Sequence, residues 1–267
     1  MIFHYIKVAY RILIKNNIYS LISIIGLSIA LSLAFIISGD VLFQLSFDKY
    51  HQNNKKIYRI LSINQEFNNR KEANSPFILG SVLKDNFPEV EEAARIVNVP
   101  FNIGYARIRK ENEDIEELEF YSADQEIFSI LDIPLISKSV DLVLADPYSI
   151  VLSESAALKY FDRENPLGQT LLVRIYGKSF ELKVTGIFKD FPENSSIKAD
   201  FFCSTDLYIE IIHPYYSNRK EITESWEEFS FVTYILFQEK TNVESFENKL
   251  NTALTNIHEV KDYRFEL

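Results

Sequence analysis

Gly177-Lys178-Ser179 is the triplet with the clearest chemical potential, because glycine, lysine and serine in this order close the phosphate-binding loop of many nucleotide hydrolases. That loop also needs a glycine five positions before Gly177, where this chain has Leu172. It further needs a helix after the lysine, so that backbone amides cradle the phosphates, whereas FELKVTGIF is typical of a strand. We therefore expect a hairpin turn here and no ATP hydrolysis by this chain.

Histidine, cysteine and serine residues also lack the spacing that metal or nucleophile chemistry requires. Ser153-Glu154-Ser155 has no flanking glycines of a nucleophile elbow, so Ser153 is interpreted as a helix cap. Cys203 is the only cysteine, which excludes an intrachain disulfide and favours a small buried side chain. We expect no catalytic, cofactor-binding or metal-binding residues, since no His-x-x-x-His pair is formed by the histidines, which are His4, His51, His213 and His258.

An uncharged run from Asn16 to Gly39 is the dominant feature of the chain. It contains IYSLISIIGLSIALSLAFIIS, which at about 1.5 Å per residue is long enough to cross a hydrocarbon layer of roughly 30 Å as a helix. The run is too long for the h-region of a signal peptide, and no A-x-A-like cleavage site follows it. The sequence therefore predicts one retained transmembrane helix over residues 16–45.

Three basic residues precede this span, with no acidic residue before Asp40: Lys7, Arg11 and Lys15. Positive charge beside the first span favours a cytoplasmic N-terminus, which places residues 46–267 outside the cytoplasm. The three lie four residues apart on one helical face, and Phe3, Ile6, Tyr10 and Leu13 lie on another. Residues 1–15 are therefore either an amphipathic helix in the cytoplasmic interface, in contact with membrane lipid, or the start of the membrane helix with snorkelling lysines.

Small side chains recur every four residues inside the span, at Gly26, Ala30, Ala34 and Ser38. A stripe of small residues lets another helix approach closely in a bilayer. We expect this face to pack against other permease helices or a second copy of the chain.

The rest of the chain, residues 46–267, alternates strand and helix patterns with many hairpins, which predicts an α+β domain. It carries a formal net charge of −12, since the first 45 residues contribute +2 to the chain's −10, and this disfavours nucleic acid as a partner. Strands are expected at 55–67, 93–108, 115–121, 149–153, 169–175, 180–188 and 229–237, and helices at 75–88, 124–131, 153–161 and Val243–Ile257.

Several segments occur in an order that resembles FtsX-like ABC-transporter permeases with a MacB-like periplasmic core domain. They are RILIKNNIYSLISIIGLSIALSLAFII, LSFDKYHQNNKKIYRI, NFPEVEEAARI, YSADQEIFSILDIPL, IVLSESAALKYFDRENPLGQTL, VTGIFKDFPENSSIKADFFCS and WEEFSFVTYILFQE. The resemblance implies one membrane helix followed by a two-lobed, mixed α/β periplasmic domain, in the inner membrane of a bacterium. It also implies that a separate cytoplasmic ABC ATPase supplies the energy.

Permeases of this family have three further transmembrane helices after the periplasmic domain, and this chain ends at Leu267. We therefore expect a non-catalytic permease subunit, or the N-terminal part of one, in an ABC-type export or mechanotransmission complex. The alternative is a single-pass scaffold that binds an envelope protein or lipoprotein without transport.

Overall fold

The computed structural model describes residues 2–66, 69–136 and 143–267. The chain divides into two compact units, Met1–Tyr50 and His51–Leu267, and each has its own internal contacts. We call the second unit the outer domain.

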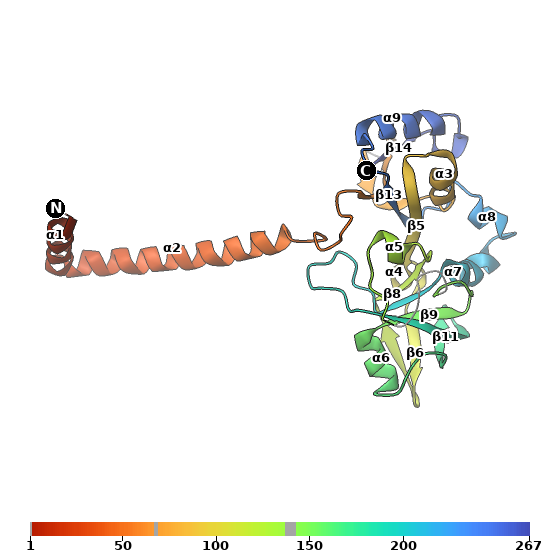
Figure 1. The fold of residues 1–267 in the computed structure, drawn as a ribbon, viewed down its shortest axis with the longest axis horizontal. Coiled ribbons are helices and arrows are strands. Elements are labelled where there is room, and N and C mark those ends of the chain that lie inside the picture. Colours follow the sequence, from red (N-terminus) through yellow and green to blue (C-terminus); the bar gives the residue numbers. More distant parts are fainter. Residues whose placement is uncertain (1, 67–68, 137–142) are drawn as a thin grey trace. The chain divides into compact units, whose positions relative to one another are not determined.

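The first unit consists of two helices, α1 (Ile2–Lys15) and α2 (Asn17–Gln44), which meet at Asn16 (Figure 1). α2 is apolar around its whole circumference and has no buried residue, as expected for a helix whose surroundings are lipid. Among the described residues it is the one helix long and apolar enough to cross a membrane. The helical character expected to continue through Tyr50 ends earlier, because residues 45–50 form turns and Asp48 has a positive φ of 56°.

The outer domain is built on a long twisted sheet of eleven described strands. Two neighbouring pairs, β8 with β12 and β9 with β11, run parallel, and the other described pairs are antiparallel. Along the sheet the strands are β1 (Ile57–Arg59), β13 (Phe231–Phe237), β5 (Val90–Asn98), β8 (Phe120–Ala123), β12 (Phe201–Ser204), β9 (Ser149–Ser153), β11 (Lys178–Phe188), β10 (Thr170–Ile175), β6 (Ala106–Lys110) and β7 (Glu113–Glu117), and β4 (Asn74–Ser75) pairs with β13. A second, antiparallel sheet contains β14 (Tyr263–Glu266), β2 (Leu61–Asn64) and β3 (Arg70–Glu72).

Short helices connect these strands, and several begin at a side-chain cap that the local sequence supplies. The oxygens of Ser153, Ser204 and Asn242 each accept a backbone N–H of the helix that follows, which satisfies a donor that the helix itself leaves unpaired. The helices are α3 (Leu79–Asn86), α4 (Val99–Ile103), α5 (Ile127–Ile130), α6 (Glu154–Phe161), α7 (Thr205–Ile212), α8 (Lys220–Thr223) and α9 (Val243–Leu254), with 3-10 turns η2 (His213–Tyr215) and η3 (His258–Val260).

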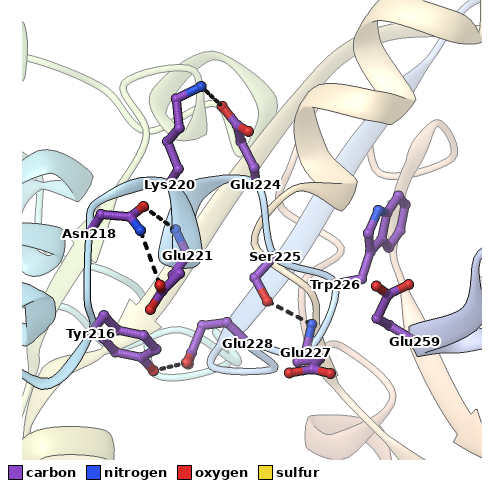
Figure 2. A pocket seen from close by; sticks show the side chains of 10 residues that line it. All are labelled: Tyr216, Asn218, Lys220, Glu221, Glu224, Ser225, Trp226, Glu227, Glu228 and Glu259. Carbon is purple, nitrogen blue, oxygen red and sulfur yellow. Dashed lines mark hydrogen bonds and ion pairs between the residues drawn. The ribbon is translucent and has the colours of Figure 1, made fainter.

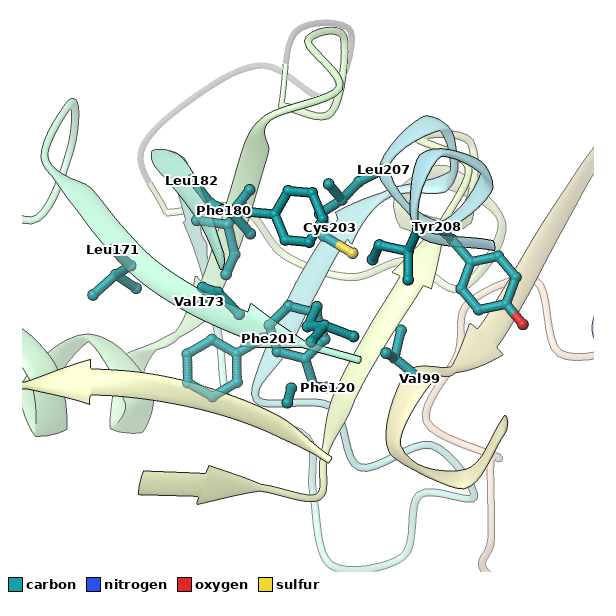
Figure 3. Packing of buried hydrophobic residues seen from close by; sticks show 14 of the residues in the cluster. Val99, Phe120, Leu171, Val173, Phe180, Leu182, Phe201, Cys203, Leu207 and Tyr208 are labelled. Carbon is teal, nitrogen blue, oxygen red and sulfur yellow. The ribbon is translucent and has the colours of Figure 1, made fainter. Parts of the chain in front are cut away.

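Alternating side chains of the central strands enter different cores on the two faces of the sheet. Phe201 and Cys203 of β12 pack with α6 and α7, whereas Phe202 between them packs with α5. Figure 3 shows Cys203 among apolar side chains of the first cluster, where the rings of Phe120 and Phe201 stack at 5.7 Å. Burial raises the pKa of the Cys203 thiol to about 12, so this cysteine is a packed apolar side chain, as the sequence predicts.

A third core lies at the β13 end of the sheet, between α3, α9 and the small sheet. Its aromatic centre is formed by Phe87, Phe237 and Phe246, whose ring centroids lie 4.8–5.4 Å apart in successive pairs. Separate cores at the two ends of one continuous sheet give a mixed α/β domain with two lobes, and the predicted α+β class is confirmed.

The expected single strand over 93–108 is wrong in its middle. Asn98 caps the short helix α4 by accepting the N–H of Phe101 at 3.0 Å, and Pro100 has no N–H with which to continue a ladder. Similarly, 55–67 divides into β1 and β2, which belong to different sheets, and 115–121 divides into the end of β7 and the start of β8. The interruptions are short: Ile60 alone separates β1 from β2, and Leu118-Glu119 separates β7 from β8.

Candidate functional site

The basic residues expected to set the orientation in the membrane, Lys7, Arg11 and Lys15, all lie on α1 and are exposed. Their spacing of four residues places them on one face of that helix. The structure therefore brings them together as the sequence predicts, and their effect on orientation stays a prediction.

The small-residue stripe lies entirely on α2, and all four of its members are exposed: Gly26, Ala30, Ala34 and Ser38. A Cβ atom added at Gly26 would meet nothing within 4 Å, so this part of the stripe is open. The hydroxyls of Ser28 and Ser32, which lie off the stripe, donate to the carbonyls of Ile24 and Ser28 at 2.7 and 2.8 Å. Helix packing by the stripe also stays a prediction.

The Gly177-Lys178-Ser179 triplet forms no phosphate loop. Tyr176 and Gly177 are the two-residue turn between β10 and β11, and Lys178 already pairs with Ile175 across the ladder. A strand, not a helix, follows the lysine, so the amide cradle of a nucleotide site is missing. Within the residues that the structure describes, no group of three or more His, Cys, Asp or Glu side chains could hold a metal ion.

The outer domain has a groove beside α8, which we call the acidic groove (Figure 2). It has a volume of about 820 Å³, and five glutamates but one lysine line it. Its lining residues are Tyr216, Asn218, Lys220, Glu221, Glu224, Ser225, Trp226, Glu227, Glu228 and Glu259.

Local hydrogen bonds fix the wall of this groove. The side chain of Asn218 accepts the N–H of Glu221 at 3.2 Å and donates to its carboxylate at 3.0 Å, which starts the single turn of α8. Ser225 likewise accepts the N–H of Glu227 at 2.9 Å, and Ile222 is fully buried beneath them. A loop of polar residues is thereby held in one conformation, in which Glu221, Glu224 and Glu227 are exposed.

The charges of the groove are mostly unbalanced. Glu224 forms an ion pair with Lys220 at 3.3 Å, but in the described part of the chain no ion pair involves Glu227, Glu228 or Glu259. Because both partners of the Lys220–Glu224 pair are exposed, solvent screens it strongly. The arrangement can attract and hold cationic groups.

Glu228 connects the groove to the interior of the domain. Its carboxylate accepts hydrogen bonds from the hydroxyls of Tyr216 and Ser230. Burial and the Glu228 charge raise the pKa of Tyr216 well above its ordinary value, and burial above all raises that of Tyr208 to about 12. Both phenols therefore remain protonated at neutral pH, so that Tyr216 stays a donor to the carboxylate.

Sequence reasoning missed this groove. Its residues come from one polar segment, 216–228, and from Glu259, which is distant in sequence, and polar segments of this kind have no periodicity that predicts a shape. The available signal was Trp226, the only tryptophan of the chain, which stands next to two glutamates.

The family model of the MacB-like periplasmic core domain matches residues 20–253 of this chain. No curated protein sequence matches this chain at a significant level. The family match covers residues 20–50 of the first unit and nearly all of the outer domain.

Solved structures share the fold, among them the following three. The first is a domain of a Porphyromonas gingivalis protein described as a permease, with 18% identity, a TM-score of 0.62, and coverage of 80% of this chain and 90% of that one. The second is the periplasmic region of MacB from Actinobacillus actinomycetemcomitans, with 15% identity, a TM-score of 0.55, and coverage of 80% and 91%. The third is the extracellular domain of the ABC-type transporter YknZ from Gram-positive bacteria, with 11% identity, a TM-score of 0.51, and coverage of 79% and 100%.

Proposed function

Because the chain belongs to the family of MacB-like periplasmic core domains, we propose that it acts as a non-catalytic permease subunit of an ABC-type export or mechanotransmission complex. In this proposal the outer domain lies in the periplasm of a bacterium, and α2 anchors it in the inner membrane. A separate cytoplasmic ABC ATPase supplies the energy, and the outer domain transmits the resulting movement to envelope substrates.

The observation that carries the proposal is the combination of an apolar membrane-spanning candidate, α2, with the family's core domain directly after it. A domain that only bound a soluble ligand would not need a helix of 28 residues that is uncharged from Asn17 to Gly39 and has no buried side chain. Two features support association of this helix with others: the open face at Gly26 and the family's role in transporter permeases.

Co-purification tests this function. The tagged full chain, extracted from native membranes with a mild detergent, is expected to bring down an ABC ATPase subunit that mass spectrometry identifies. The same preparation should also contain further permease helices, either from another subunit or from a second copy of the chain. Recovery of the chain without any other membrane subunit would favour the alternative, a single-pass scaffold that binds an envelope protein or lipoprotein.

Orientation in the membrane is a separate prediction. A periplasm-dependent reporter such as alkaline phosphatase, fused after Leu267, should be active, because Lys7, Arg11 and Lys15 hold the N-terminus in the cytoplasm. Replacement of all three by Glu should lower the active fraction. The charge-preserving changes Lys7→Arg, Arg11→Lys and Lys15→Arg should leave it unchanged. An active cytoplasmic reporter at the same position would refute the proposed topology.

A further inference from the structure

A second, smaller pocket adjoins the acidic groove and shares two residues with it, Tyr216 and Glu228. Its volume is about 210 Å³, below the range of roughly 300–1,000 Å³ that drug-sized ligands occupy. We call it the tyrosine pocket, and its lining residues are Asn102, Ile103, Tyr176, Tyr208, Ile212, Tyr215, Tyr216, Glu228 and Ser230. The size fits one long side chain, while the adjoining groove has room for the chain that would carry it.

Four tyrosine rings and one carboxylate give this pocket a definite chemical preference. The rings of Tyr176 and Tyr215 meet edge to face at 5.2 Å between centroids, and both remain about half exposed or more, at 51% and 63%. Aromatic faces attract a guanidinium or ammonium group, and the attraction grows when a carboxylate lies close by. Glu228 supplies that carboxylate, which the pocket and the groove share.

Tyr176 occupies a turn position at which tyrosine is unfavourable. It and Gly177 have φ values of 51° and 75°, so both central residues of this two-residue hairpin are in the left-handed region, as in a type I′ turn. Asparagine or glycine is favoured at the first of these positions, and a bulky aromatic residue there is an outlier. The turn thus presents an aromatic ring to the pocket where a different residue would stabilise the hairpin better.

From these observations we propose that the tyrosine pocket and the acidic groove together bind an extended, arginine- or lysine-rich segment of a protein partner. One basic side chain enters the tyrosine pocket toward Glu228, and neighbouring basic side chains pair with the carboxylates of the groove, among them Glu227 and Glu259. Complementary charge selects this occupant over an acidic or uncharged one. That the partner is an envelope protein rests on the proposed orientation, but the binding itself does not.

Trp226 provides a direct readout, because it is the only tryptophan of the chain and lines the groove. The full chain in detergent micelles is titrated with a short synthetic peptide in which arginine alternates with serine, while the emission of Trp226 is recorded. We expect a saturable change in emission that weakens with added salt, since exposed charges are screened. A peptide with glutamate in place of arginine should cause no change.

Two variants test the two halves of the site. Tyr176→Asn should weaken peptide binding about threefold to fivefold while the unfolding temperature stays equal or rises, because asparagine suits the turn but has no aromatic face. Glu228→Gln should weaken binding about tenfold.

Since Glu228 is partly buried, the paired change Glu227→Gln with Glu259→Gln is a second test that leaves the interior intact. Glu113→Gln on β7, which lines neither pocket, is the matched control and should bind like the unaltered chain.

Several results would overturn the proposal. These are equal binding of the glutamate peptide, unchanged binding by Tyr176→Asn, an effect of Glu113→Gln as large as that of Glu228→Gln, or peptide binding with no response of Trp226. Equally strong binding of a single blocked arginine would overturn it as well, because the site would then take a small organic cation and not a peptide segment.

Discussion

Phe87 ends the apolar stripe of α3, and its ring packs against that of Phe246 of α9 at 5.4 Å between centroids. Its side chain is 3% exposed, so truncation would remove a buried ring. Phe87→Ala should lower the free energy of unfolding by about 3–5 kcal/mol, because the lost ring leaves a cavity between two helices. Urea titration followed by circular dichroism measures the loss, and the exposed Leu158→Ala is the control. A loss below about 1 kcal/mol would contradict the packing at this site.

Asp200 makes the stability of the outer domain depend on pH, and a single substitution can test this dependence. Burial above all, with the nearby charges of Glu117 and Asp190, raises its pKa from the ordinary 3.8, against the opposing effects of Ser153 and Lys159. Because the pKa of Asp200 is higher in the folded state than in the unfolded state, the protonated carboxyl contributes its full stability below pH 3.8. This contribution is lost as the pH rises through the raised pKa of the folded state.

Asp200→Asn should therefore be more stable than the unaltered chain at neutral pH, and this advantage should disappear in acid. Asparagine can still accept the hydrogen bond that the Ser153 hydroxyl now donates at 2.9 Å. Unfolding free energies of both proteins, compared from acid to neutral pH, measure the difference. An advantage that is constant across this range would show that the Asp200 charge is not its cause.

At the scale of helices, the stripe on α2 predicts a specific packing defect. Gly26→Leu and Ala30→Leu should each weaken helix association by about 1–2 kcal/mol, because the larger side chains separate the two backbones. Ser28→Leu, on a different face of the same helix, makes a similar increase in size and is the matched control. Energy transfer between labelled chains in bilayers, or recovery of the assembled complex, measures association. Equal effects at Gly26 and Ser28 would show that the stripe has no special role.

Elements with strong local patterns could be predicted from the sequence, and those that depend on distant partners could not. α9 begins at Val243 as expected, since Asn242 caps it and Phe246, Leu250 and Leu254 lie on one buried face. It ends at Leu254 and not at Ile257, because a turn to η3 and β14 follows. β13 also lies within the predicted 229–237, but its antiparallel pairing with both β1 and β5 joins strands far apart in the sequence, which no local pattern encodes.

The acidic groove and the tyrosine pocket illustrate the same limit at the proposed binding site. Tyr176 comes from a hairpin turn, Tyr215 from η2 and Ile103 from α4, and only the completed fold brings them together. The hairpin around Tyr176 was itself predictable, because Gly177 accommodates the positive φ that a tight turn requires. Its neighbours across the pocket were not, since they come from segments far apart in the sequence.

For the whole molecule, the division at His51 predicts that the outer domain folds without its anchor. His51 is 7% exposed, and its Nδ1 lies 2.6 Å from the carbonyl oxygen of Leu131, while the N–H of Asn53 donates to Asp132 at 3.3 Å. The first residues of the domain are therefore attached to its own interior. Residues 51–267 contain the three cores described above, and their excess of acidic residues favours solubility.

Residues 51–267 expressed alone should be soluble and unfold cooperatively in urea, and should show no ATPase or hydrolase activity. Cys203→Ala in this chain should cost only about 1 kcal/mol, because the cysteine has no disulfide partner and alanine removes one buried atom. A shorter chain that begins at Lys56 loses the contacts of His51 and Asn53, and should be less stable by about 1–3 kcal/mol. Equal stability of the two chains would place the true start of the domain after Asn53. Aggregation of residues 51–267, reversed when α2 is restored, would show instead that the core needs the membrane helix to fold.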